Sequence, residues 1–246
     1  MAVFSLRQAA AVGDLSGRIS LARDIYGYRR GHLPTDPVGV GARMSLRDWA
    51  AIGLRTSFNL NVIAVGIESF TDSMFDEVDT AVARMREVYG AIGIGIKWVW
   101  HWQISTADAD GLDVITSEDD VDDLLSGWIV DENAGIDLYF PAAWNPQGPD
   151  QTLLGKSALP GPCPGEKDGK GKNGSCVGLT GKTFSSRSAS HEIGHYLSLK
   201  HRDEEPQNIM CPTKFAASPT WQAVGFDDDQ ATDVKRHCMV LKIWSP

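Results

Sequence analysis

Two histidines four residues apart, His191 and His195, restrict the fold of this chain more than any other feature of the sequence. They lie in the segment SHEIGHYLSLKHRDEEPQNIM, which ends at Met210. On an α-helix, side chains at this spacing share one face about a turn apart, so both rings can reach one metal ion. On a straight helix, the next histidine, His201, would lie roughly 15 Å along the axis from His191. We therefore predict that the helix ends near Leu197 and that the chain then turns back.

Three neutral imidazoles leave a tetrahedral zinc ion with one open position, which distinguishes a catalytic zinc site from a structural one. Glu192 directly follows the first histidine and projects about 100° round the helix from it, where its carboxylate can reach a water at the open position. The residues therefore predict one catalytic zinc ion on His191, His195 and His201, with Glu192 as the general base.

The residues from His191 to His201 follow the pattern H-E-x-x-H-x-x-S-x-x-H, and the sequence NIM ends nine residues later at Met210. This combination resembles the metzincin clan of zinc endopeptidases, whose pattern is H-E-x-x-H-x-x-G-x-x-H with a downstream Met-turn. The resemblance implies that the three histidines bind zinc, that Glu192 is the base and that the Met210 side chain underlies the metal. No tyrosine stands two positions after Met210. The resemblance therefore favours a matrix-protease-like or pappalysin-like branch over the branches with a tyrosine ligand.

One position departs from the clan's pattern, because Ser198 stands where the clan has glycine. Glycine adopts the left-handed conformation of a helix end at little cost. A serine in that conformation costs about 1 kcal/mol. We expect strain at Ser198 that does not abolish the turn.

Strand and helix patterns alternate along the chain before the histidine segment. Strands are predicted at residues 59–67, 94–104 and 135–140, with amphipathic helices after Ser73, where Asp76 completes a capping box, and after Ser117. This order favours an α/β fold with a mostly parallel, twisted sheet and two backing helices. A last short strand at 176–180, a metal-binding helix starting near Ser186 or Ser188 and a final helix opened by the acids at 227–229 complete the prediction.

The resemblance adds two elements to this fold. The first is an antiparallel edge strand, assigned to Ile136–Phe140, that pairs with an extended substrate. The second is a small C-terminal lobe that contains the Met-turn and the final helix.

A row of tryptophans alternates with polar residues in the strand at 94–104. Trp98, Trp100 and Trp102 share this alternation with Ile96 and Ile104. One apolar face packed on a helix explains the row better than a ligand-stacking platform does.

The sequence suggests two regions. Residues 1–57 are an N-terminal extension or a pro-segment, and residues 58–246 are a catalytic domain with an upper part to about residue 200 and a lower part at 201–246. A pro-segment of the clan can place a cysteine or an aspartate on the zinc. No cysteine precedes Cys163, which excludes a cysteine switch, whereas Asp24 or Asp36 could serve. The glycine- and proline-rich segment 141–175 either rims the substrate cleft or is a surface insertion.

Four cysteines, Cys163, Cys176, Cys211 and Cys238, allow three disulfide pairings. We prefer Cys163 with Cys176 and Cys211 with Cys238, because the glycine-rich loop offers no core in which the first pair could be buried. The alternative is four reduced thiols in a cytosolic protein. Disulfides favour secretion or another oxidising compartment, although no signal peptide is visible.

Charge and composition limit the partners. A net charge of −9 argues against nucleic acid or an anionic membrane as the main partner. No apolar run has the length of a membrane span. Asp108, Asp110 and Asp113 are spaced too closely for a twelve-residue calcium loop, so a structural calcium ion is not supported.

The sequence predicts a monomeric zinc endopeptidase that acts on protein or peptide substrates. The alternative from another class is a zinc-containing binding or toxin module that has lost catalysis, with Ser198 as the first sign. A third reading is a gluzincin-type peptidase, whose third ligand is a glutamate that usually lies on a second helix further downstream; the short gap, Pro206 and the Met-turn favour His201 instead. If His201 does not bind the metal, Asp203 or Glu204 is the other candidate for the third ligand.

Overall fold

The structure is a computed structural model that describes residues 6–8, 56–130, 133–147, 153–167, 171–203, 205–212 and 225–242. Asp24 and Asp36, the two candidates for an inhibitory aspartate, lie outside the described residues. The division of the chain at residue 57 and at about residue 200 stays a prediction. Strand β2 begins at Thr56, two residues before the predicted start of the catalytic domain at residue 58.

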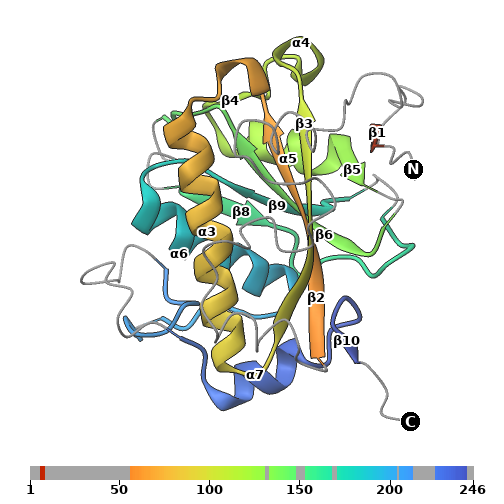
Figure 1. Cartoon of the computed structure of the whole chain (residues 1–246), viewed down its shortest axis with the longest axis vertical. Coiled ribbons are helices and arrows are strands. Elements are labelled where there is room, and N and C mark those ends of the chain that lie inside the picture. Colours follow the sequence, from red (N-terminus) through yellow and green to blue (C-terminus); the bar gives the residue numbers. More distant parts are fainter. Residues whose placement is uncertain are drawn as a thin grey trace.

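A six-stranded sheet forms the centre of the molecule (Figure 1). Its strands are β2 (Thr56–Val65), β3 (Gly95–Ile104), β6 (Gly135–Pro141), β8 (Gly155–Ser157), β9 (Gly174–Val177) and β10 (Leu241–Lys242). Strands β3, β2, β6 and β9 lie parallel in that order, β8 pairs antiparallel with β9, and β10 pairs antiparallel with the start of β2. The predicted fold class, a mostly parallel sheet with an antiparallel edge strand, is confirmed.

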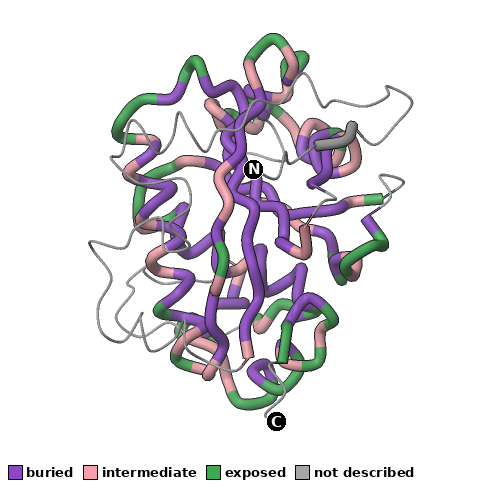
Figure 2. The backbone as a smooth tube through the Cα atoms, turned by 45° about the vertical axis from the view of Figure 1, so that its right-hand side comes forward, coloured by how far each residue is buried: buried purple, intermediate pink, exposed green. Residues whose placement is uncertain are grey.

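Helices cover both faces of this sheet. Helices α3 (Asp72–Ala91) and α6 (Lys182–Tyr196) pack against each other over one face, and α5 (Glu118–Gly127) covers the other (Figure 1). Each face has its own apolar core, and the central strands β2 and β6 are buried apart from Thr56 at the start of β2 (Figure 2), as expected for parallel strands between helices. Among the described residues, no helix has the length and apolarity needed to cross a membrane.

Shorter elements complete the described chain. They are β1 (Leu6–Gln8), η2 (Ile67–Ser69), α4 (Thr106–Ala109), β4 (Val114–Ile115), β5 (Trp128–Val130), β7 (Ala143–Trp144) and α7 (Asp228–Val234).

The capping residues at the starts of α5 and α7 agree with the sequence prediction, and the one at the start of α3 does not. Ser117 caps α5 as predicted, and Asp227 caps α7. The prediction for α3 was wrong, because Thr71 rather than Ser73 accepts the capping hydrogen bond, from the N–H of Met74 at 3.3 Å.

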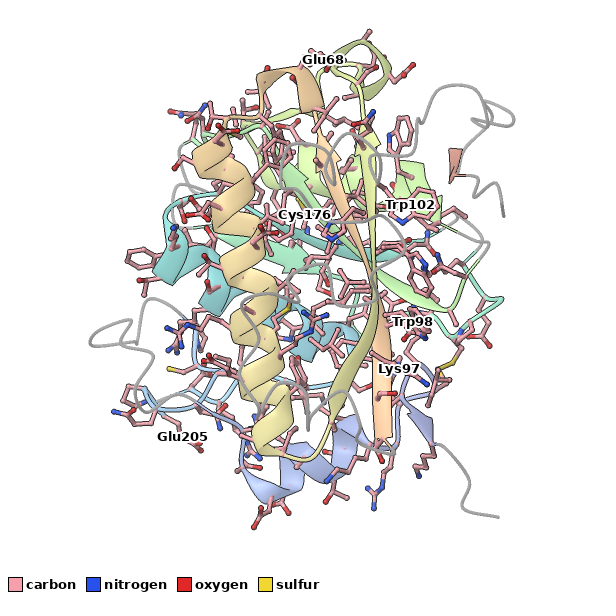
Figure 3. The ribbon with its side chains drawn as sticks, viewed as in Figure 1. Glu68, Lys97, Trp98, Trp102, Cys176 and Glu205 are labelled. Atoms are coloured by element: carbon pink, nitrogen blue, oxygen red, sulfur yellow. A yellow bond between two sulfur atoms is a disulfide. The ribbon has the colours of Figure 1, made fainter. Side chains whose placement is uncertain are left out.

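The predicted row does not keep one face along the whole of β3. The rings of Trp98 and Trp100 stack with their centroids 6.3 Å apart, and Trp100 packs on the same core as Trp102, whereas Ile96 belongs to the opposite core. The register of β3 against β2 shifts between Phe58 and Leu60, as at a β-bulge. An extra residue reverses the alternation of side chains beyond it. Ile96 therefore lies in the core under α3 and α6, whereas Trp102 lies in the opposite core. Trp98 is 40% exposed. Figure 3 labels Trp98 and Trp102.

The assignment of Ile136–Phe140 as the edge strand was wrong. The strand that contains these residues, β6, lies between β2 and β9, and all of its residues are buried. The reason is that β8, which comes from the segment expected to be irregular, and β9, which begins two residues before the strand predicted at 176–180, extend the sheet beyond β6. The antiparallel edge is β8, at Gly155–Ser157.

A buried ion pair fixes the segment that carries β8. Lys167 Nζ donates to Asp137 Oδ1 at 2.9 Å and to the carbonyl oxygens of Val130 and Gly135 at 3.1 and 2.6 Å. Asn61 Nδ2 donates to the same carboxylate at 2.8 Å. A buried charge pair is tolerated only when its remaining polar atoms are bonded in this way. Through these bonds, Lys167 attaches the end of the segment 153–167 to the sheet.

The structure contains one disulfide among the described residues, Cys163–Cys238, with a Cα–Cα distance of 5.5 Å. Both preferred pairings were wrong. Cys176 lies on β9 and its side chain belongs to the core beneath α5 (Figure 3), so Cys163 cannot reach it. Cys211 is buried and free. Helix α7 ends at Val234, so Cys238 lies beyond its inward face, where it meets Cys163.

Replacing Cys163 and Cys238 by serine should lower the free energy of unfolding by about 2 to 4 kcal/mol, because the crosslink restricts the unfolded chain. Urea unfolding of parent and double variant, each with and without a phosphine reductant, measures this. The reductant should destabilise the parent only. Equal stabilities of the two proteins, or four free thiols in the denatured parent, would contradict the Cys163–Cys238 pairing.

Candidate metal centre

The three histidines of the sequence motif lie together. The ring centroids are 4.6 Å apart for His191 and His195, 4.7 Å for His195 and His201, and 5.2 Å for His191 and His201. One ring nitrogen from each histidine lies within 4.8 Å of the corresponding nitrogens of the other two, and this is the one cluster among the described residues that could hold a metal ion. Asp203, considered as an alternative third ligand, is not part of the cluster, and Glu204 lies outside the described residues.

The chain reversal that brings His201 back occurs at the predicted place. Helix α6 ends at Tyr196 with Leu197 as its C-cap, and Ser198 has φ +78°. The N–H of Ser198 donates to the carbonyl of His195, and the N–H of Leu199 donates to the carbonyl of Gly194, both at 2.9 Å. These two bonds define a Schellman motif with serine at the position that glycine usually takes.

Backbone carbonyls orient two of the rings. His191 Nδ1 lies 2.8 Å from the carbonyl oxygen of Ile209, and His195 Nδ1 lies 2.7 Å from that of Leu199. A carbonyl oxygen only accepts hydrogen bonds, so each Nδ1 carries the proton and each Nε2 keeps its lone pair. This is the tautomer that a metal-binding histidine needs. Burial, aided by neighbouring histidines, lowers the pKa of His191 to about 3, and burial lowers that of His195 to about 4.

The start of α6 depends on a residue that the sequence analysis missed. The helix begins at Lys182, earlier than the predicted Ser186 or Ser188. Glu77 on α3 accepts the N–H of Gly181 at 2.7 Å and the hydroxyl of Ser185. A carboxylate at the positive end of a helix stabilises it. No local pattern indicates Glu77, because it lies more than a hundred residues away in the chain.

Met210 packs directly against α6 at Gly194, between His191 and His195 in the sequence. Met210 is fully buried, and a Cβ atom built on Gly194 would lie 2.5 Å from its Sδ. Gly194, between the two helical histidines, therefore admits the Met210 side chain. The N–H of Arg202, next to His201, donates to the Met210 carbonyl at 3.0 Å, so the methionine segment also holds the returning chain.

Three further polar side chains hold the turn that carries Met210. Asn208 accepts from the N–H of Met210 at 2.9 Å and exchanges two hydrogen bonds with Gln230, at 2.9 and 3.1 Å. Arg187 on α6 donates to the carbonyls of Asn208 and Cys211 at 3.1 and 3.4 Å. All three side chains are buried. Side chains of both α6 and α7 thus hold the turn.

Glu192 lies in a confined site beside the edge strand. Its side chain is 6% exposed, and a Cβ atom on Gly155 of β8 would lie 2.8 Å from Glu192 Cγ. Any side chain at Gly155 would therefore displace the carboxylate. Burial raises the pKa of the Glu192 carboxyl to about 8. The sequence gives no signal for Gly155, which acts through a contact across 37 residues.

A hollow of about 430 Å³ joins these groups. Its lining includes β8, Leu159, Glu192, Lys200 and the three histidines. Because β8 and Leu159 come from the segment 141–175, that segment rims the hollow and is not a detached surface insertion.

Comparisons with known proteins give limited matches. No protein-family model and no curated protein matches the sequence. Among solved structures, the fold is similar to an archaemetzincin from Methanopyrus kandleri, with 14% identity and a TM-score of 0.46 over 73% of this chain and 95% of that one. It is also similar to metalloproteinase-II from Bacteroides fragilis, with 12% identity and a TM-score of 0.45 over 72% of this chain and 52% of that one. A function is not transferred by fold, so we argue it from the side chains.

Ser198→Gly should raise the free energy of unfolding of the metal-free protein by up to about 1 kcal/mol, because glycine removes the strain at φ +78°. The greater freedom of glycine in the unfolded chain offsets part of this gain. Ser198→Val should be destabilised, since a branched side chain tolerates this conformation least. Urea unfolding compares the three proteins, and a glycine variant less stable than the parent would show that the turn does not strain Ser198.

The metal-free protein should lose stability as the pH rises from 6.5 to 8. Glu192 has a folded pKa of about 8 against an ordinary value of 4.5, so its contribution is present at low pH and is lost as the pH passes 8. The lowered pKa values of His191 and His195 act in the opposite direction, but only below about pH 6.5. The expected slope is at most about 1.4 kcal/mol per pH unit. Urea unfolding in a chelator should show this slope for the parent and not for Glu192→Gln; an equal slope in both proteins would refute it.

Proposed function

We propose that this chain is a zinc-dependent endopeptidase. One observation carries the proposal: a buried carboxylate, Glu192, lines the same hollow as three imidazoles that converge on one point. Three histidines and a neighbouring acid are the groups that metal-assisted hydrolysis requires.

The donor set fits zinc. Imidazole nitrogen is a preferred zinc ligand, and three protein ligands leave the fourth position open. His191 and His195 already hold their Nδ1 atoms on backbone carbonyls, which leaves Nε2 for the metal. His201 is the exposed member, so it borders the solvent side of the site. We propose that these three residues hold the ion and that Met210 supports them from beneath the helix.

When bound, a zinc ion supplies a positive charge that polarises a scissile carbonyl, makes a water more acidic and lowers the pKa of a nearby carboxyl group. Glu192 then takes the proton from the attacking water and gives it to the leaving amine. The buried position of Glu192 keeps bulk water from competing for that proton. Gly155 leaves the carboxylate room to face the hollow.

The edge strand offers a way to bind an extended peptide. Among the described strands, β8 pairs only with β9, so its outer edge is free to form backbone hydrogen bonds. A peptide that adds to this edge passes the hollow that contains Glu192 and the histidines. We propose this edge, rather than Ile136–Phe140, as the substrate-binding strand.

The disulfide Cys163–Cys238 fits an oxidising environment. We propose secretion, or another oxidising compartment, as the site of action.

The alternative, a binding module without catalysis, rested on Ser198. Ser198 adopts the left-handed turn and preserves both hydrogen bonds of the motif, so it gives no sign of lost function. Retention of Glu192 in the hollow favours the enzyme.

Glu192→Gln should retain zinc and lower the rate of casein cleavage by at least about a hundredfold, because the isosteric amide cannot accept the proton. Glu87→Gln on α3 is the matched control, since Glu87 is exposed and far along the chain from the site. Cleavage and zinc content are measured on the same samples. A Glu192→Gln protein that carries zinc and cleaves casein as fast as the parent would exclude Glu192 as the base.

A further inference from the structure

Two hollows flank His201. The first, of about 430 Å³, contains Glu192 and the three histidines, and the second, of about 450 Å³, extends from His201 toward α7. Lys200 and His201 line both. A ligand that extends from one hollow into the other must therefore pass Lys200.

The backbone of Lys200 is held on both sides. The preceding residue, Leu199, donates its N–H to Gly194 and accepts from His195 Nδ1. Two residues further on, the N–H of Arg202 donates to Met210. The exposed Lys200 side chain thus extends from a backbone segment that hydrogen bonds hold beside the proposed reaction centre.

The other charged groups of the two hollows already have partners. Lys156 binds Glu118 and Asp122, and Arg202 lies 3.1 Å from Asp227. Asp233 is 3.3 Å from Arg236.

Glu192 has its own role as the proposed base. Lys200 forms no ion pair with any residue in the described part of the chain. Among the described residues that line the two hollows, it is therefore the one cation whose charge is free for a ligand.

We infer that Lys200 is a specificity-determining residue that recognises a carboxylate of the peptide substrate close to the scissile bond. This inference rests on the proposed function, because it assigns a substrate preference to the same site. Because its net charge is −9, the protein as a whole repels an acidic peptide. A carboxylate of the substrate therefore binds near the scissile bond only if a nearby cation offsets this repulsion. An ammonium group is a point charge without a fixed fork, so it accepts a carboxylate in several orientations.

The carboxylate can come from two sources. An aspartate or glutamate side chain within the peptide is one, and the free C-terminal carboxylate of a short peptide is the other. Both present the same chemistry to Lys200.

The test uses a set of otherwise identical peptides with amidated C-termini in which one glutamate moves through the positions on either side of the scissile bond. Glutamine replaces glutamate in the matched set, and a third set of glutamine peptides ends in a free carboxylate. Product mass analysis gives kcat/KM for each peptide with the parent, Lys200→Met and Lys200→Glu. Lys242→Met is the control, because Lys242 is exposed on β10 and lines neither hollow.

The parent should prefer the carboxylate by about fivefold at one position, which is the size of an exposed charge pair. Lys200→Met should remove this preference, Lys200→Glu should reverse it, and Lys242→Met should keep it. A preference in the amidated set identifies an acidic side chain, and a preference in the third set alone identifies the C-terminus. A parent without preference, or a preference that survives in Lys200→Met, overturns the inference.

A binding measurement separates this inference from the proposed function. The peptides are titrated by fluorescence anisotropy into Glu192→Gln, with and without Lys200→Met. If no peptide is cleaved but the glutamate peptide binds about fivefold tighter and loses this advantage with Lys200→Met, the peptidase proposal fails and the role of Lys200 stands. If both peptides are cleaved equally well, the peptidase proposal stands and the role of Lys200 fails.

Discussion

The site depends on the left-handed turn at Ser198. Two helical histidines are a local consequence of four-residue spacing, but His201 reaches them only because α6 ends at Tyr196 and the chain reverses. The same turn brings the Leu199 carbonyl to His195, so one backbone feature places the third ring and orients the second. Its cost, about 1 kcal/mol at a serine, is small beside the hydrogen bonds and burial that it makes available.

The surroundings of the turn explain why it is stable. Met210 fills the space that Gly194 leaves on α6, and the Asn208 and Gln230 pair holds the methionine segment in place. On the other side of the helix, β8 confines Glu192 through Gly155. The two charged groups of the site thus differ in burial: the carboxylate of Glu192, the proposed base, is enclosed, whereas the Lys200 side chain is exposed.

The sequence predicted what local spacing controls. The end of α6 and the positions of most strands and helices follow from periodicity and capping. The sequence did not indicate the bulge in β3, the place of β8 at the sheet edge or the Cys163–Cys238 bond. Each of these depends on contacts between segments far apart in the chain. Gly155 and Glu77 were missed for the same reason, because one residue of common type carries no pattern of its own.

Zinc K-edge absorption of the purified protein, with elemental analysis, tests the central claim most directly. The account predicts one zinc ion per chain with three imidazole nitrogens at about 2.0 to 2.1 Å, and loss of both the ion and this signature in His201→Ala. A parent that binds no zinc, a spectrum with fewer than three imidazoles or with sulfur ligands, or unchanged zinc content in His201→Ala would contradict it.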